Sequence, residues 1–230
     1  MHPLTRTARI TGAFYLGLAI TGMLGFLLIR PQVFIAGDAE STFAAIVDSL
    51  LLARVGLLLE LGIVVTQVLA ALWFFKLFRS VNSFAAGSLA TLGLLNAVAI
   101  LGSAASLSTA LAVADAGYAE SAVQVGLLVH LSEGFWAVGT VFFGLWLIPM
   151  GYLALTSGYI WRWLGWVLIV GGVGYVVSIV VATLAPEASL AVGLLTIPAT
   201  IGEFGMIGYL LIRGVHPRAL SEARRETVSA

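Results

Sequence analysis

The sequence predicts an all-α protein that crosses a membrane six times and has no separate soluble domain. The chain is 60% hydrophobic and only 10% charged, whereas a soluble domain carries roughly 25% charged residues. Apolar runs of about 20 residues, the length that spans a bilayer, recur along the chain. Because such a chain could not cover its apolar surface in water, the lipid bilayer is its expected main partner.

Six apolar runs separated by polar, Pro or Gly residues are the expected spans. They cover residues 10–29, 52–76, 83–112, 123–148, 160–184 and 190–212. The first run resembles a signal peptide, but Arg30 and Pro31 follow it instead of a small-residue cleavage site, so it is expected to be retained. The whole chain, 1–230, is then one membrane domain, with 213–230 as a cytoplasmic tail.

The distribution of charge predicts the orientation. If the spans alternate, one side collects the basic residues Arg6, Arg9, Lys76, Arg79, Arg162, Arg213, Arg218, Arg224 and Arg225, and the other side has only Arg30 and Arg54. By the positive-inside rule both termini lie in the cytoplasm, as in a multi-pass protein of a bacterial plasma membrane. An interfacial belt of Trp73, Trp146, Trp161, Trp163 and Trp166 is expected on the basic side.

The longest outer loop, 30–56, is expected to contain a short amphipathic helix on the outer surface before the second span. Asp38 is a plausible N-cap. The apolar residues Phe43, Ile46, Val47 and Leu50 then share one face. A simple extension of the second span explains the same residues equally well.

Small residues at four-residue spacing predict close helix packing. Such rows are Gly17, Thr21 and Gly25, and again Gly102, Ser106, Ala110 and Ala114. The stretch "VGGVGYV" at 170–176 lies inside a span and lacks the Lys of a phosphate-binding loop. Its glycines are therefore expected to serve packing.

Composition excludes several function classes. The formal net charge is zero and there is no basic patch with interleaved aromatic residues, so no nucleic-acid partner is expected. The chain has no cysteine, which excludes disulfides, iron–sulfur clusters and thiolate catalysis. No cofactor is expected. Haem b with two axial histidine ligands is excluded, because His2 and His216 lie at the cytoplasmic ends, away from His130.

Ionisable residues inside the spans are the candidate functional residues. They are Glu60, His130, Glu133 and Glu203, with Arg54 near an outer end. A charge at the bilayer centre costs about 2.5–3.5 kcal/mol and usually has a partner. Because spans two, four and six run in the same direction, these residues are expected to line one polar cavity. Arg54 is expected to turn inward and to pair with Asp48, Glu60 or Glu133.

Four interpretations of this polar set remain open. A cavity that binds or moves a small solute or a proton is the leading one, since ionisable ladders mark such paths. A non-catalytic membrane partner, in which polar residues only hold the helices together, is the main alternative. A carboxylate-rich metal site has only one histidine to support it. An intramembrane enzyme with a carboxylate pair as acid and base is also less favoured, because no catalytic motif supports it.

Several stretches resemble one family. They are "ARITGAFYLGLAI" near the start, "GDAESTF" and "LLARVG" in the outer loop and second span, and "FFGLWLIPMGYLALTSGYIWRWLGWVLIVGGVGYVV" at 142–177. The chain is similar to the bacterial membrane proteins catalogued as domain of unknown function 4386. This resemblance implies a bacterial plasma-membrane protein of similar helical architecture and implies no activity. A family segment similar to "LARVG" has an Arg at the place of Arg54.

Overall fold

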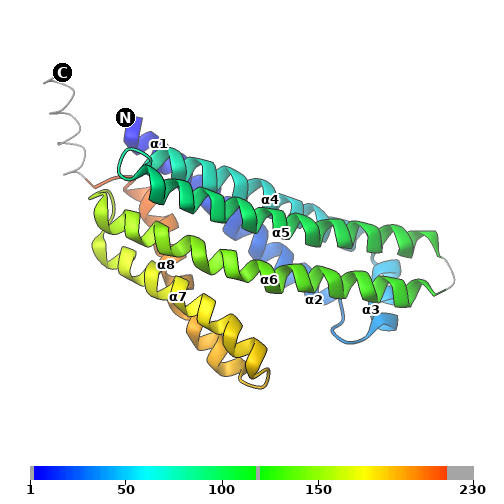
Figure 1. Ribbon diagram of the computed structural model, residues 1–230. Coiled ribbons are helices and arrows are strands. Elements are labelled where there is room, and N and C mark those ends of the chain that lie inside the picture. Colours follow the sequence, from blue (N-terminus) through cyan, green and yellow to red (C-terminus); the bar gives the residue numbers. More distant parts are fainter. Residues whose placement is uncertain (1–2, 118–119, 217–230) are drawn as a thin grey trace, which may run out of the picture. The chain divides into compact units, whose positions relative to one another are not determined.

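The computed structural model describes residues 3–117 and 120–216. Every regular element within these ranges is helical (Figure 1). The elements are α1 (Pro3–Gly22), η1 (Met23–Ile29), α2 (Arg30–Val33), α3 (Ala39–Asp48), α4 (Leu50–Phe78), α5 (Ser83–Ala116), α6 (Ser121–Thr156), α7 (Arg162–Leu184) and α8 (Ser189–Ile212). The expected all-α class is therefore confirmed for these residues.

Six helical stretches in the described part of the chain are long and apolar enough to cross a membrane. The first is the continuous stretch α1–η1–α2, Pro3–Val33, and the others are α4 to α8. The chain is thus a multi-pass membrane protein by the length and composition of its helices. Several helices run further than predicted, among them α5, which reaches Ala116, and α6, which continues through Pro149 to Thr156. Residues 217–230 of the expected tail lie outside the described residues.

The chain divides into two compact units, and the boundaries between the units fall within α1, α4, α5 and α6. The first unit contains 1–16, 67–96 and 140–230, and the second contains 17–66 and 97–139. Charge is unevenly distributed between them. Among the described residues, the first unit includes the acidic residues Glu187 and Glu203 and more basic ones, namely Arg6, Arg9, Lys76, Arg79, Arg162 and Arg213. The described part of the second unit includes the basic residues Arg30 and Arg54 and more acidic ones, namely Asp38, Glu40, Asp48, Glu60, Asp115, Glu120 and Glu133.

In the first unit, glycines allow α7 and α8 to pack as a close pair (Figure 1). A Cβ at Gly171 would overlap the backbone of Ala199, and a Cβ at Gly174 would overlap the carbonyl oxygen of Leu195. Both glycines are buried. The prediction that the glycines of 170–176 serve packing is confirmed at these two positions.

In the second unit, α3 is a separate short helix. The side chain of Asp38 accepts a 2.9 Å hydrogen bond from the backbone N–H of Ser41, which confirms the predicted N-cap. Ser49, with φ −129° and ψ 48°, separates α3 from α4, so the loop is not a simple extension of the second span. Ile46 is buried, but Val47 is half exposed, so the buried face is narrower than predicted.

Ile46 of α3 belongs to a core that joins several elements of the second unit. This core comprises Val33, Ile46, Ala53, Leu107, Ala110, Leu111, Ala114, Val125 and Val129. The predicted rows of small residues pack closely in the same unit. A Cβ at Gly17 would lie 3.1 Å from the side chain of Thr66, and one at Gly25 would lie 3.3 Å from Leu59. The α1–η1 stretch therefore approaches α4 closely along this row.

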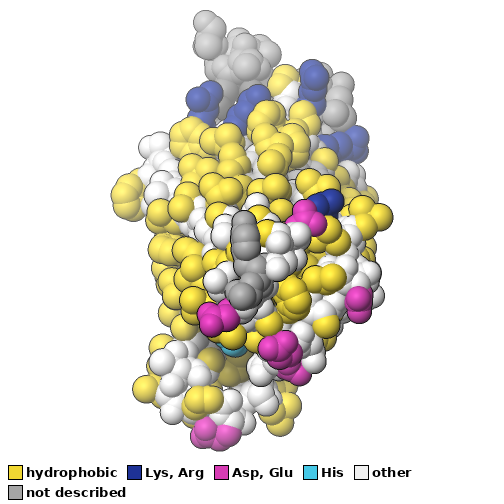
Figure 2. All heavy atoms as spheres, turned by 90° about the vertical axis from the view of Figure 1, so that its right-hand side faces the viewer, with side chains coloured by type: hydrophobic (Ala, Val, Ile, Leu, Met, Phe, Trp, Pro, Cys, Tyr) yellow, Lys and Arg dark blue, Asp and Glu magenta, His cyan; other side chains and the backbone are white. Residues whose placement is uncertain are grey.

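Apolar side chains are exposed along the outer faces of the helices, as lipid contact requires. Figure 2 shows large areas of hydrophobic side chains, with acidic side chains scattered between them. On α7 the exposed residues recur every three or four positions: Trp163, Trp166, Val170, Val173, Val177 and Val180. The expected tryptophan belt needs one correction. Trp146 is completely buried because it packs against Tyr15 and Phe74, so it cannot lie in an interfacial belt.

Candidate functional site

An ion pair between Arg30 and Glu60 is the centre of a buried polar site in the second unit. The Nη1 atom of Arg30 lies 3.9 Å from Oε2 of Glu60, and the two side chains are 13% and 7% exposed. Arg30 begins α2 directly after the π-helix η1, and its backbone N–H bonds to the carbonyl of Gly25, five residues earlier. This wider helical turn, which is often found at functional sites, sets the direction of the Arg30 side chain.

Two buried serines provide a second connection between the same charges. Arg30 Nη2 donates to Ser132 Oγ at 3.2 Å. The hydroxyls of Ser132 and Ser103 are 2.6 Å apart, and the Ser103 side chain hydrogen-bonds to Glu60. A guanidinium only donates and a carboxylate only accepts. The Ser132 hydroxyl therefore accepts from Arg30, and α2, α4, α5 and α6 are joined by one polar ring.

Aromatic side chains enclose the ion pair. Trp136 donates its indole N–H to Oε1 of Glu60 at 3.1 Å, and its ring lies 5.1 Å from that of Phe26. The guanidinium of Arg30 lies 5.6 Å from the ring centre of Phe26 and 5.3 Å from that of Phe34. Such cation–π contacts stabilise a cation that has lost its water.

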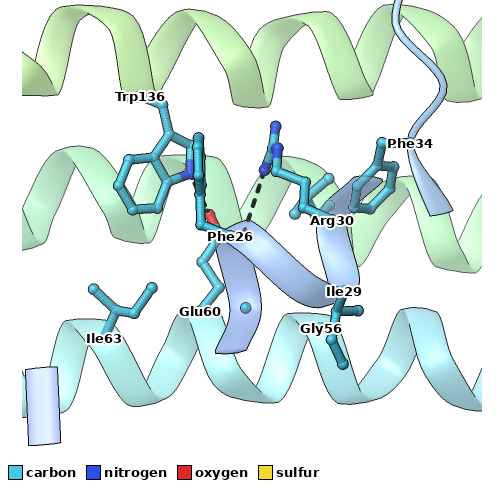
Figure 3. Close-up of a pocket in the computed structure, with 10 residues that line it drawn as sticks. Phe26, Ile29, Arg30, Phe34, Gly56, Glu60, Ile63 and Trp136 are labelled. Atoms are coloured by element: carbon cyan, nitrogen blue, oxygen red, sulfur yellow. Dashed lines mark hydrogen bonds and ion pairs between the residues drawn. The ribbon is translucent and has the colours of Figure 1, made fainter. Parts of the chain in front are cut away.

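The ion pair borders a small pocket (Figure 3). Its cavity volume is about 20 Å³, which is enough for about one water molecule. The lining residues are Gly25, Phe26, Ile29, Arg30, Phe34, Gly56, Glu60, Ile63, Leu107 and Trp136. In Figure 3 the Arg30 side chain extends from its short helix towards Glu60, with Phe26 and Trp136 beside them. The pocket is thus apolar except for the ion pair and the indole N–H.

The predicted site residues lie in different surroundings in the structure. Glu60 lines the pocket. His130 and Glu133 contact each other at 3.2 Å, with side chains that are 65% and 44% exposed. Glu133 also interacts electrostatically with Arg30. Glu203 lies in the first unit, where it accepts a hydrogen bond from Tyr15. A single cavity shared by the predicted residues stays a prediction.

The prediction of a partner for Arg54 was wrong. Arg54 does not turn inward to Asp48, Glu60 or Glu133. Its Nη2 atom lies 3.3 Å from Oδ2 of Asp115, and both side chains are 57% exposed. The reason is that α5 continues beyond the predicted end at residue 112 and carries Asp115.

The buried guanidinium belongs instead to Arg30, which was expected to follow the first span and to begin the outer loop 30–56. Its position directly after an apolar run is typical of an interfacial residue. Ser103 and Ser132 were also missed. Ser132 stands between His130 and Glu133 in "HLSEG", and Ser103 follows the small residue Gly102. For Ser132 the available signal was its closeness to His130 and Glu133, and for Ser103 it was its place beside the row of small residues that begins at Gly102. Among the described residues, no three His, Cys, Asp or Glu side chains are grouped as metal ligands would be.

Comparison with known proteins supports the resemblance noted in the sequence. A search of the curated proteins found no match, and a search of the solved structures found none either. A match to one protein family extends over residues 10–214. It includes α2, α4, α5 and α6, which supply the polar site. The chain belongs to the family described as Domain of unknown function (DUF4386).

Proposed function

We propose that this protein is a bacterial plasma-membrane protein that binds and moves a proton at the Arg30–Glu60 site. Glu60 is the proton acceptor and donor, and Arg30 stabilises the form of Glu60 that has released its proton. Ser132 and Ser103 hold the two charged side chains in position while the proton is exchanged.

The observation that carries this proposal is a loose ion pair beside a water-sized space. A separation of 3.9 Å is longer than a direct N–H···O hydrogen bond. The pocket of about 20 Å³ can hold roughly one water molecule but not a larger solute. A water or a proton at this place would contact the Glu60 carboxyl directly.

Helix stabilisation alone is the alternative, and the polar ring gives it some support because it joins α2, α4, α5 and α6. Charged residues are unfavourable for that purpose, because burying them costs desolvation free energy. A buried ion pair often stabilises a protein no more than apolar residues of the same volume would. Ionisable residues inside membranes more often mark paths for ions or protons. The charges at Arg30 and Glu60 therefore favour proton handling.

The proposed orientation has both termini in the cytoplasm and α3 on the outer surface. The basic residues of the first unit and the acidic residues of the second support this orientation. The exposed side chains of Trp161, Trp163 and Trp166 at the start of α7 support an interface there. Bacterial location rests on the family resemblance described above.

Proton movement is tested with the full chain in liposomes that enclose a pH-sensitive dye. After an external acid step, wild-type liposomes should acidify faster than empty ones. Glu60→Gln should reduce the rate to that of empty liposomes, whereas the matched variant Glu40→Gln, at an exposed position of α3, should behave as wild type. Wild-type flux in Glu60→Gln, together with a lowered melting temperature, would favour the stabilising role instead.

A further inference from the structure

The first unit contains a second group of buried polar side chains, separate from the Arg30–Glu60 site. Gln67 of α4 and Trp146 of α6 are completely buried, and Asn96 of α5 is 3% exposed. Both polar atoms of Gln67, Nδ2 of Asn96 and Nε1 of Trp146 have no hydrogen-bond partner within residues 3–117 and 120–216. We call Gln67, Asn96 and Trp146 the amide cluster.

The side chains of Gln67 and Trp146 meet where α5 has no side chain at Gly93. A Cβ on Gly93 would lie 3.3 Å from Nε2 of Gln67 and 3.1 Å from Cε3 of Trp146. Asn96 follows Gly93 by three residues, so it lies on the same face of α5. The same Cβ would lie 3.1 Å from Ala71, four residues after Gln67 in the antiparallel helix α4. Gln67 and Asn96 are therefore at nearly the same level along the helix pair.

Leaving these atoms unpaired is unfavourable. A buried donor or acceptor without a partner loses its hydrogen bonds to water and gains nothing in return. In a membrane-spanning helix no bulk water is available to restore them. Natural proteins usually satisfy such groups with ordered water molecules.

The polar atoms themselves indicate the kind of ligand. The unpartnered atoms include N–H donors on all three residues and one acceptor, Oε1 of Gln67. Water can accept from the donors and donate to the acceptor. An anion is a poor fit, because it could not donate a hydrogen bond to Oε1 of Gln67. The Tyr15 ring lies 5.5 Å from that of Trp146, and its hydroxyl donates to Glu203.

From this arrangement we infer that the amide cluster binds ordered water inside the membrane-spanning part of the first unit. The water bridges the side chains of Gln67, Asn96 and Trp146, and it lies beside the Tyr15–Glu203 hydrogen bond. This site is independent of the proposed proton exchange at Glu60, because its residues belong to other positions and to the other compact unit.

Solid-state NMR of the full chain in lipid tests this inference directly. Magnetisation from water protons should reach the side-chain amide nitrogens of Gln67 and Asn96 in the wild type. In Gln67→Met, which has similar volume but no hydrogen bonds, the Asn96 signal should be lost because the bridging water leaves. The absence of water transfer to both amides in the wild type would overturn the inference, whatever the variant does.

Thermal unfolding is a second test, because a water-bridged amide and an unpaired amide predict different shifts of the melting temperature in Gln67→Met. If water bridges the cluster, Gln67→Met should lower the melting temperature, since Asn96 and Trp146 lose their partner. If the amide is simply unpaired, the same change should raise the melting temperature or leave it unchanged, and the inference would be wrong. Gln124→Met, at an exposed position of α6, is the matched control and should cause no shift.

Discussion

Arg30 combines three kinds of contact that a surface arginine seldom has together. It pairs with Glu60, donates to Ser132, and packs over the rings of Phe26 and Phe34. Removing its side chain would leave Glu60 buried without its charged partner. Loss of one partner of a buried ion pair is typically far more costly than loss of an exposed one.

Arg30→Ala should therefore destabilise the protein by roughly 3 kcal/mol. Arg54→Ala should cost less than about 1 kcal/mol, because the Arg54–Asp115 pair is exposed. Chemical denaturation of both variants in the same detergent measures the difference. Equal losses of stability would show that the contacts of Arg30 have little energetic value.

Asp38 shows how a single carboxylate fixes the start of a helix. The side-chain hydroxyl of Ser41 and its backbone N–H both donate to this carboxylate, and they lower the pKa of Asp38 below its ordinary value of 3.8. A lowered pKa means that the stabilisation is complete above the unfolded-state pKa. It is lost as the pH falls through the pKa of the folded state.

The amide resonance of Ser41 should report this titration by NMR. In the wild type it should shift with a midpoint below pH 3.8. Asp38→Asn should keep the helix cap, because asparagine is also a good N-cap, but should abolish the titration. A midpoint at or above the ordinary value would contradict the hydrogen bonds assigned to this cap.

At the scale of the elements, the contact between α7 and α8 depends on the absence of side chains. Gly171→Ala should destabilise the protein by about 1–3 kcal/mol, because the new methyl group would overlap the backbone of Ala199. Gly208→Ala is the control, since no atom lies within 4 Å of its Cβ position. It should stabilise α8 by up to about 1 kcal/mol through helix propensity.

Melting temperatures of the two alanine variants in lipid nanodiscs provide the comparison. The prediction is a decrease for Gly171→Ala and no decrease for Gly208→Ala. Unchanged stability in Gly171→Ala would mean that α7 and α8 are not as close as the structure has them.

The helices could be predicted from the sequence because length and apolarity are local properties. The end of α6 could not be predicted in this way, since Pro149 is tolerated inside a membrane helix. The site was found only in part. Glu60 was predicted from its cost in lipid, but the partner of Glu60 depends on η1, a π-helix that changes the direction of Arg30. A hydropathy profile does not show where a helix changes from α-helical to π-helical turns.

At the scale of the whole molecule, six spans with both termini inside make a simple prediction. A reporter fused after Ala230 should be cytoplasmic, and a tag inserted near Ala116, at the end of α5, should be accessible from outside. Protease protection in intact cells and in inverted vesicles measures both positions. Finding the two tags on the same side would contradict the six-span topology.

The proposal that Glu60 exchanges a proton is tested most directly by infrared spectroscopy of the full chain in lipid. A protonated carboxyl gives a C=O band that disappears when the proton is released, so a pH titration counts the groups that exchange. If Glu60 exchanges the proton, the titrating band should be absent in Glu60→Gln and still present in Glu203→Gln. Persistence of the complete titrating band in Glu60→Gln would contradict it.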